Sequence, residues 1–153
     1  IDVLQWITGM SFTEVISARN WCAFRLGGSP FRDAAQMMLT MENGCGVLGD
    51  VSFIAPKGPG FSLAYYWEFT LWGDRGVLRT GLNRDTLELW RGNEATMVSI
   101  PKQEERPSDY FVQFIGELVG TPGELTTAVV LDASRKALLI QKAADEDLHR
   151  LRL

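Results

Sequence analysis

The sequence predicts an α+β fold, in which a mostly antiparallel sheet of about six strands carries helices on one face. Between residues 12 and 100 the chain consists of short runs with the two-residue period of strands. Only short turns separate most of these runs, which favours antiparallel neighbours. Apolar residues then recur with helical spacing over residues 110–148. Strands followed by helices, without regular alternation, are typical of α+β domains.

The first nine residues, IDVLQWITG, have the pattern of the body and the end of an amphipathic helix. No capping residue precedes Ile1, and no initiator Met is present. The start of a helix leaves N–H groups that need capping, so domains rarely begin there. We therefore expect a fragment of a larger protein, with residues 1–153 forming one α+β domain.

The first half of the predicted sheet contains a long strand and a hairpin. Apolar and polar residues alternate over residues 12–21, with Phe12, Ile16 and Ala18 expected on one face and Val15 on the other. Residues 35–42 and 45–54 flank Asn43-Gly44. An Asn-Gly pair between alternating runs is the strongest short hairpin signal, because both residues tolerate positive φ.

The second half of the predicted sheet is a meander that begins with an aromatic strand over residues 63–72. Three breaker-containing turns, at residues 73–76, 83–85 and 92–93, then separate further short strands. Those strands are expected at residues 77–80, 86–90 and 95–100. Loops rich in Gly, Pro or polar residues are expected at residues 24–32, 55–62 and 101–106.

Two helices are expected to close the chain. Ser108 or Asp109 can cap a helix over residues 110–119, and Gly120 can end it. A longer helix is expected from about Thr126 to Leu148. With the N-terminal helix, these segments can cover one face of the sheet, yet the strands are apolar on both faces. The other face is expected to be open, to meet a subunit, a domain or a ligand; a face with scattered exposed aromatics is the alternative.

Composition excludes several partners. The net charge of −4 and the isoelectric point of 5.0 argue against nucleic acid, which needs a basic surface. No apolar run approaches the roughly 18 residues needed to span a membrane. Cys22 and Cys45 do not make a disulfide framework, and we expect both to be small buried residues of a reduced, cytoplasmic protein.

No reaction can be identified from residue patterns. The single His149 lies in a charged stretch near the C-terminus, without a Ser–His–Asp order or a metal-binding cluster. Asp33 and Asp50 are isolated carboxylates suited to turn or edge roles. Arg32 is a candidate ligand contact. Three aromatic residues form either a sugar- or polyol-binding surface or an apolar interface. They are Tyr65, Tyr66 and Trp67.

Several segments, in their order and spacing, resemble the C-terminal domain of the Gfo/Idh/MocA oxidoreductases. The opening helix, the strand that ends in Glu42-Asn43-Gly44 and the two closing helices all match that template. The segment EFTLWGDRGVL, residues 68–78, resembles the family's strand and Gly-x-x-Gly element. The likeness covers nearly the whole chain.

This resemblance implies a fragment of a two-domain, NAD- or NADP-dependent enzyme that acts on a sugar, a polyol or a related substrate. The missing Rossmann domain would bind the dinucleotide, and this fragment would bind none. Asp2 matches the Asp of the family's His-x-x-Asp motif, whose His would precede Ile1. No catalytic residue is therefore expected in this chain.

Under the resemblance, Arg32, Tyr65, Tyr66 and Trp67 are substrate or interface contacts, and the open sheet face joins subunits into a homo-oligomer. The fragment itself is expected to be inactive. A competing hypothesis, independent of the resemblance, is a stand-alone α+β interaction module that dimerises through its sheet.

Overall fold

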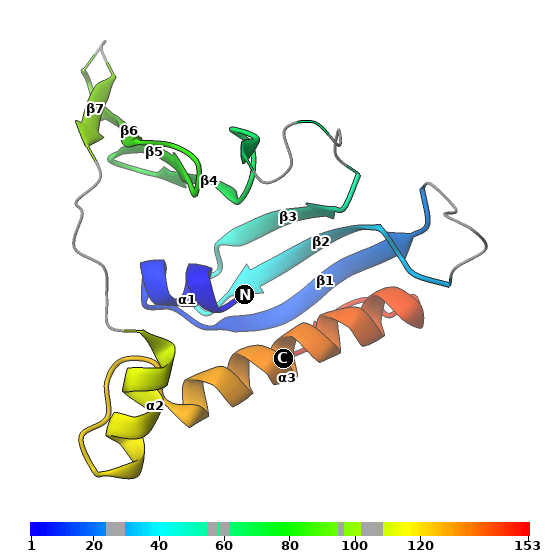
Figure 1. Cartoon of the computed structure of the whole chain (residues 1–153). Helices are drawn as coiled ribbons and strands as arrows, with labels where there is room; N and C mark the ends of the chain where they lie inside the picture. Colours follow the sequence, from blue (N-terminus) through cyan, green and yellow to red (C-terminus); the bar gives the residue numbers. More distant parts are fainter. Residues whose placement is uncertain (24–29, 55–57, 59–61, 95–96, 102–108) are drawn as a thin grey trace. The chain divides into compact units, whose positions relative to one another are not determined.

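The computed structural model describes residues 1–23, 30–54, 58, 62–94, 97–101 and 109–153. These residues form three α-helices and eight strands, which make two antiparallel sheets of four strands each (Figure 1). The predicted α+β class and antiparallel pairing are confirmed. The strands divide into two sheets, and the predicted loops at residues 24–32, 55–62 and 101–106 lie largely outside the described residues.

The chain clusters into two compact units. The first comprises residues 1–54 and 108–153, and the second comprises residues 55–107. The sheet of the first unit has the strand order β3-β2-β1-β8. Its strands are β1 (Phe12–Trp21), β2 (Ala34–Met41), β3 (Gly46–Ser52) and β8 (Leu151–Arg152). Its helices are α1 (Asp2–Thr8), α2 (Tyr110–Leu118) and α3 (Thr127–Asp145).

The predicted hairpin joins β2 to β3. The Asn43 side-chain oxygen accepts a hydrogen bond from the Cys45 N–H at 3.0 Å, and Gly44 has the left-handed φ of 82° that the turn requires. Cys45 lies exposed in this loop, so the prediction that it is buried is wrong. Because the Cys45 N–H bonds to the Asn43 side chain in the turn, Cys45 belongs to the loop and its thiol lies outside the sheet.

β1 does not alternate strictly. Phe12, Val15 and Ala18 are buried together, so the prediction that Val15 faces away from the other two is wrong. The ladder between β1 and β2 shifts register twice, between Phe12 and Glu14 and between Val15 and Ser17. Each bulge adds a residue to one strand and reverses the side-chain direction that follows. The buried spacing along β1 is therefore three residues.

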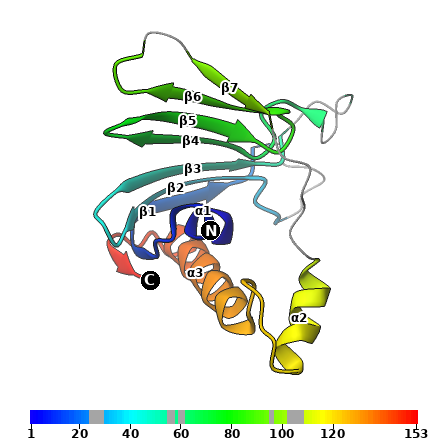
Figure 2. The ribbon, with the colours of Figure 1, turned by 90° about the vertical axis from the view of Figure 1, so that its left-hand side faces the viewer.

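α3 lies along one face of this sheet and supplies the other half of the core (Figures 1 and 2). The buried apolar cluster comes from β1, β2 and α3. Its members are Phe12, Val15, Ala18, Leu39, Met41, Ile140 and Ala143. Leu4 of α1 and Ile1, its N-cap, pack against the same cluster, which puts α1 and α3 on one face, as predicted.

A buried lysine joins α1, α3 and the start of β1. The Lys136 side chain is about 5% exposed, and its ammonium group donates to the Gln5 side-chain oxygen at 2.9 Å, to Asp132 at 2.6 Å and to the Ser11 hydroxyl. An ammonium has three donors, and each finds an acceptor here. We call Gln5, Ser11, Asp132 and Lys136 the polar clamp. It allows a charge to be buried without an unpaired proton.

The termini of the predicted helices are close to those observed. Asp109 caps α2 by accepting from the Phe111 N–H at 3.1 Å, and Thr126 caps α3 by accepting from the Val129 N–H. α3 ends at Asp145, and the chain then returns along β1 as β8. This two-residue strand was not predicted, because it is too short to show any period.

The second unit is a four-stranded meander. Its strands are β4 (Glu68–Gly73), β5 (Gly76–Gly81), β6 (Thr86–Arg91) and β7 (Val98–Pro101). Residues 63–67 were predicted to extend β4, and this prediction is wrong. The Tyr66 N–H donates to the Leu63 carbonyl in a turn, and Trp67 has a left-handed φ of 50°. β5 ends at Gly81, opposite Glu68, so no partner strand remains for residues before β4.

Among the described residues, no helix combines the length and the apolar character needed to cross a membrane.

The core of the first unit is tested by truncating Leu39, which is 1% exposed. We expect Leu39→Ala to lower the free energy of unfolding by about 2–5 kcal/mol, because it removes buried methyl groups and leaves a cavity. Leu138→Ala, at a site 70% exposed, is the matched control and should cost under about 0.5 kcal/mol. Urea unfolding measures both. Equal losses would contradict the assignment of the core.

The polar clamp predicts a pH-dependent stability. The hydrogen bond from Lys136, with one from Gln5, holds the pKa of Asp132 below its usual 3.8 against the opposing effect of burial. A lowered carboxyl pKa contributes stability that is present above 3.8 and lost as pH falls through the folded-state value. Asp132→Asn should therefore destabilise the chain at neutral pH, by an amount that shrinks below pH 3.8.

Urea unfolding at several pH values checks this expectation. The matched control is Asp147→Asn, at a carboxyl that is 93% exposed. Its effect should be small throughout. A penalty for Asp132→Asn that stays constant down to the acid limit would show that the clamp does not depend on the ionised carboxylate.

Candidate functional site

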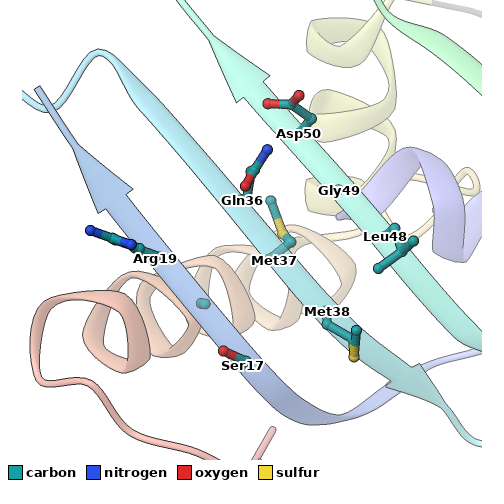
Figure 3. Close-up of a pocket in the computed structure, with 9 residues that line it drawn as sticks. Ser17, Arg19, Gln36, Met37, Met38, Leu48, Gly49 and Asp50 are labelled. Atoms are coloured by element: carbon teal, nitrogen blue, oxygen red, sulfur yellow. The ribbon is translucent and has the colours of Figure 1, made fainter. Parts of the chain in front are cut away.

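The open face of the first sheet has a shallow depression of about 440 Å³ on the side away from the core. Three cross-strand rows line it, each with one residue from β1, β2 and β3 (Figure 3). The middle row is Ala18, Met37 and Gly49, and the two outer rows carry the side chains of the open face. One outer row is Ser17, Met38 and Leu48; the other is Arg19, Gln36 and Asp50. The depression therefore combines an apolar row with a row that runs from a cation, through an amide, to an anion.

The register of the hairpin and the regular pairing of β1 with β2 from Ser17 onward create this arrangement. Met37 points to the core side and lies over Gly49, where any added Cβ would come within 2.8 Å of the Met37 side chain. Met38 and Leu48, one residue along, therefore point to the open side, where both are exposed. After the second bulge, Ser17 and Arg19 join them on that face.

The chemistry of this face suits contact and recognition. The described residues contain no cluster of His, Cys, Asp and Glu that could hold a metal ion. Arg19 and Asp50 can each pair with an opposite charge, and the exposed Met38 and Leu48 can bury apolar surface. Alternation places Ser17 and Arg19 on one face of β1, but sequence reasoning did not select them or Gln36, because the rows they form depend on how β1, β2 and β3 pair.

The second unit holds the predicted aromatic candidates in the turn before β4. The Tyr66 and Trp67 rings lie tilted, with centroids 6.2 Å apart, while Tyr65 and Trp67 are largely exposed. Two hydrogen bonds tie this turn to the β5–β6 connection. The Asn83 amide donates to the Leu63 carbonyl at 2.8 Å, and the Leu82 N–H donates to the Trp67 carbonyl. The structure thus brings the three aromatic candidates into one local turn.

A ring of ion pairs lies directly after this aromatic turn. Glu68 accepts from Arg79 at 2.7 Å and from Arg84 at 3.0 Å, and Glu88 accepts from Arg84 at 3.1 Å. Burial would raise the pKa of Glu68, but the hydrogen bonds and charges of the two arginines outweigh it and lower the pKa overall. The ring thus holds four charged side chains together, and one of them, Glu68, directly follows the aromatic turn.

The other sequence candidates lie elsewhere. Arg32 is exposed in the first unit, where its charge adds to the hydrogen bonds from Asn20 and Gln141 that lower the pKa of Asp145. Asp2 opens α1, and its carboxylate accepts from the Val3 N–H at 2.9 Å. His149 is exposed, with its ring 3.7 Å from Asp147. Both side chains are exposed, Asp2 at the start of α1 and His149 after α3.

Comparison with known proteins shows a shared fold. No protein-family model and no curated protein matches the chain. A solved structure of a protein from Thermotoga maritima, provisionally classed as an oxidoreductase, matches with a TM-score of 0.77 and 21% identity over 98% of this chain. An aldose-aldose oxidoreductase from Caulobacter crescentus, solved as a complex with glycerol, matches with a TM-score of 0.72 and 15% identity over 99% of it.

An oxidoreductase domain protein from Kribbella flavida matches more weakly, with a TM-score of 0.54 and 19% identity over 95% of this chain. The chain spans 44% of the first two structures and 38% of the third, so it corresponds to less than half of each. At these identities the likeness concerns the fold. The chain has the fold of one part of these oxidoreductases, which confirms the fold expected from the resemblance.

The backbone conformation of Trp67 allows a test of whether its ring stabilises the fold of the second unit. Trp67 has a left-handed φ and a ring that is 54% exposed. Asn tolerates this backbone conformation better than Trp, so Trp67→Asn should leave the thermal midpoint unchanged or raise it. The control is Trp72→Asn in the extended backbone of β4, where Asn disfavours the strand and should lower the midpoint.

Thermal unfolding followed by circular dichroism compares the two variants. If Trp67→Asn were the more destabilising, the Trp67 ring would be a packing residue of this unit rather than a surface available to a ligand.

Proposed function

We propose that the chain is the substrate-binding and oligomerisation domain of an NAD(P)-dependent oxidoreductase of the Gfo/Idh/MocA type. One observation carries the proposal: nearly the whole chain matches oxidoreductase structures, yet it covers only 44% of the first two. A domain that accounts for less than half of an enzyme leaves room for a second domain with a separate task.

The proposal assigns the dinucleotide to that second domain. A dinucleotide site needs a strand that leads through a glycine-rich turn into a helix. In the described part of this chain, α1 precedes the first strand and α3 follows α2. The stretch between β7 and α2, residues 102–108, contains no glycine. The described elements therefore do not fit a site for NAD or NADP.

The substrate proposed for the enzyme is a sugar, a polyol or a related hydroxyl or carbonyl compound. Exposed aromatic rings beside charged side chains suit such ligands, because the rings offer flat apolar faces and the charges offer hydrogen bonds. In the second unit, Tyr65, Tyr66 and Trp67 supply the rings, and Glu68 with its arginine partners supplies the charges. In the first unit, Arg32 is a separate candidate contact. The glycerol in the Caulobacter structure gives this class a precedent among the neighbours.

The open face of the first sheet is proposed as the contact between copies in a cytoplasmic homo-oligomer. Arg19 and Asp50 end one row with opposite charges, and a two-fold axis through such a row sets each charge against its opposite. Met38 and Leu48 would be buried beside them. A stand-alone interaction module that dimerises through its sheet shares this surface and differs in having no dinucleotide-binding partner domain.

Dinucleotide titration separates the two functions. The longer natural protein that contains this chain should bind NADH or NADPH with a dissociation constant in the micromolar range, about 1 μM–1 mM. The purified 153-residue chain should bind neither. Fluorescence of the reduced nicotinamide measures both. Tight binding by the chain alone would contradict the assignment, and a natural protein that ends at these 153 residues would favour the interaction module.

The proposed subunit contact predicts a charge-sensitive association. Leu48→Glu should convert the oligomer to monomers, because it places a carboxylate in the centre of an apolar contact. Asp74→Lys, in the β4–β5 turn, is a control that changes charge at an exposed site elsewhere and should leave the mass unchanged. Analytical ultracentrifugation measures the mass. An unchanged mass for Leu48→Glu would remove the open face from the contact.

A further inference from the structure

The turn between β2 and β3 contains a chemically reactive pair of residues that the proposed function does not use. Asn43 is exposed, and the next residue, Gly44, is exposed as well. The backbone nitrogen of the residue after an asparagine can attack the side-chain amide, and a side chain on that residue hinders the attack. Gly44 has no side chain, and the position that a Cβ would occupy has no other atom within 4 Å. Nothing near the turn blocks this reaction sterically.

We propose that Asn43 is a site of spontaneous deamidation, and that opening of the β2–β3 turn controls its rate. The Gly44 nitrogen gives up its proton and bonds to the Asn43 Cγ, while the bond from Cγ to Nδ2 breaks and ammonia leaves with that proton. Water then opens the cyclic imide. Cleavage at Cγ gives aspartate, and cleavage at the main-chain carbonyl gives isoaspartate. One water is consumed and one ammonia is released, and nothing is oxidised or reduced.

Three hydrogen bonds hold the reacting atoms in the closed turn. The Gly44 N–H donates to the Met41 carbonyl at 2.8 Å, and this bond must break before the nitrogen can lose its proton. The Asn43 side-chain oxygen accepts from the Cys45 N–H at 3.0 Å, and the Asn43 amide nitrogen donates to the Cys45 sulfur at 3.1 Å. These two bonds hold the amide toward Cys45. The closed turn therefore restrains both the nucleophile and the group it attacks.

One of these contacts has an opposing effect. The Cys45 N–H on the Asn43 side-chain oxygen draws electrons from Cγ, which favours attack on that carbon. This effect matters only after the Gly44 nitrogen is released, because an amide that still holds its proton is a poor nucleophile. The Met41 N–H also closes the turn by donating to the Cys45 carbonyl at 2.9 Å. Since one neutral hydrogen bond shifts an equilibrium about two- to tenfold, two backbone bonds should slow the reaction about tenfold or more.

The isoaspartate product would alter the sheet, whereas the aspartate product would not. In isoaspartate the main chain passes through the side chain, which adds a methylene group to the loop. Loop length sets the register of a hairpin. The observed register pairs Thr40 with Gly46 and Met38 with Leu48, whose side chains line the depression on the open face (Figure 3). Isoaspartate at position 43 therefore acts on the open face of the first sheet.

The chain supplies its own controls. It has four asparagines, and Asn43 is the one that precedes a glycine. Each of the others precedes a residue with a long side chain that hinders attack. They are Asn20, Asn83 and Asn93, followed by Trp21, Arg84 and Glu94. Asn93 is the best matched of these, because it too is exposed in a turn between strands.

Incubation of the purified 153-residue chain in mildly alkaline buffer, which promotes loss of the Gly44 proton, tests the proposal. Peptide mass spectrometry follows conversion at Asn43 and Asn93, and a synthetic peptide of residues 38–48 is the open-turn reference. We expect conversion at Asn43 and none at Asn93, with the peptide reacting faster than the chain by about tenfold or more. Equal conversion at the two asparagines would overturn the site. Equal rates in chain and peptide would overturn the control by the turn.

A strand variant tests whether turn opening controls the rate. Thr40→Gly weakens the ladder next to the turn, so it should speed both Gly44 amide exchange and Asn43 deamidation, each by up to about fivefold. Ser52→Gly, at the far end of the same hairpin, is the matched control and should change neither rate. Faster exchange of the Gly44 amide without faster deamidation would contradict the proposal.

The isoaspartate fraction tests the structural consequence. Its β2 and β3 amides near Met38 and Leu48 should exchange faster than those of the unmodified chain. Asn43→Asp gains the same charge without the extra methylene group and should keep its protection. Equal protection in the isoaspartate fraction and Asn43→Asp would remove the effect on the open face. None of these measurements involves a dinucleotide or a substrate, so they are independent of the oxidoreductase assignment.

Discussion

The structure of the first unit depends on β1 and its two bulges. β1 is the strand that pairs with both β2 and β8, and its two bulges bring Val15 to the face of Phe12 and Ala18. α3 packs along that face, and the polar clamp attaches α1 where β1 begins. After the second bulge the chain alternates again, so Ser17 and Arg19 lie on the face opposite Ala18. β1 therefore contributes to both the core and the candidate contact surface.

The two long helices of the C-terminal third behave in opposite ways. α3 buries its apolar residues on the sheet and also buries Lys136, whose charge is matched by three acceptors. α2 buries nothing and directs its polar residues to its own chain. Both helices have a side-chain N-cap, so the contrast does not come from a missing N-terminal cap. The difference in burial arises because α3 packs on the sheet of the first unit, whereas none of the residues of α2 is buried.

Local signals predicted much of this fold. The Asn43-Gly44 turn, the Asp109 cap, the start of the long helix near Thr126 and the meander turns each depend on a few neighbouring residues, and all were found. The oxidoreductase-like fold expected from the resemblance was also found. These features need no knowledge of distant contacts.

Features that depend on pairing between distant segments were missed. The bulges of β1 depend on β2, and β8 forms only because β1 has a free edge. The turn at residues 64–67 looked like a strand because aromatic residues favour strands, yet no partner strand extends that far. The polar clamp joins residues more than 120 positions apart, which no local pattern reports. Arg32 and the aromatic turn remain predicted ligand contacts, in separate units of the chain.

α3 is packed in the core of the first unit, whereas none of the residues of α2 is buried. Amide hydrogen exchange on the 153-residue chain tests it most directly. The account predicts that amides of α3 near Ile140 and Ala143 exchange at the slow, global limit, and that amides of α2 exchange at least about a hundredfold faster. Equal protection in the two helices would contradict the claim, because it would mean that α2 is already covered within this chain.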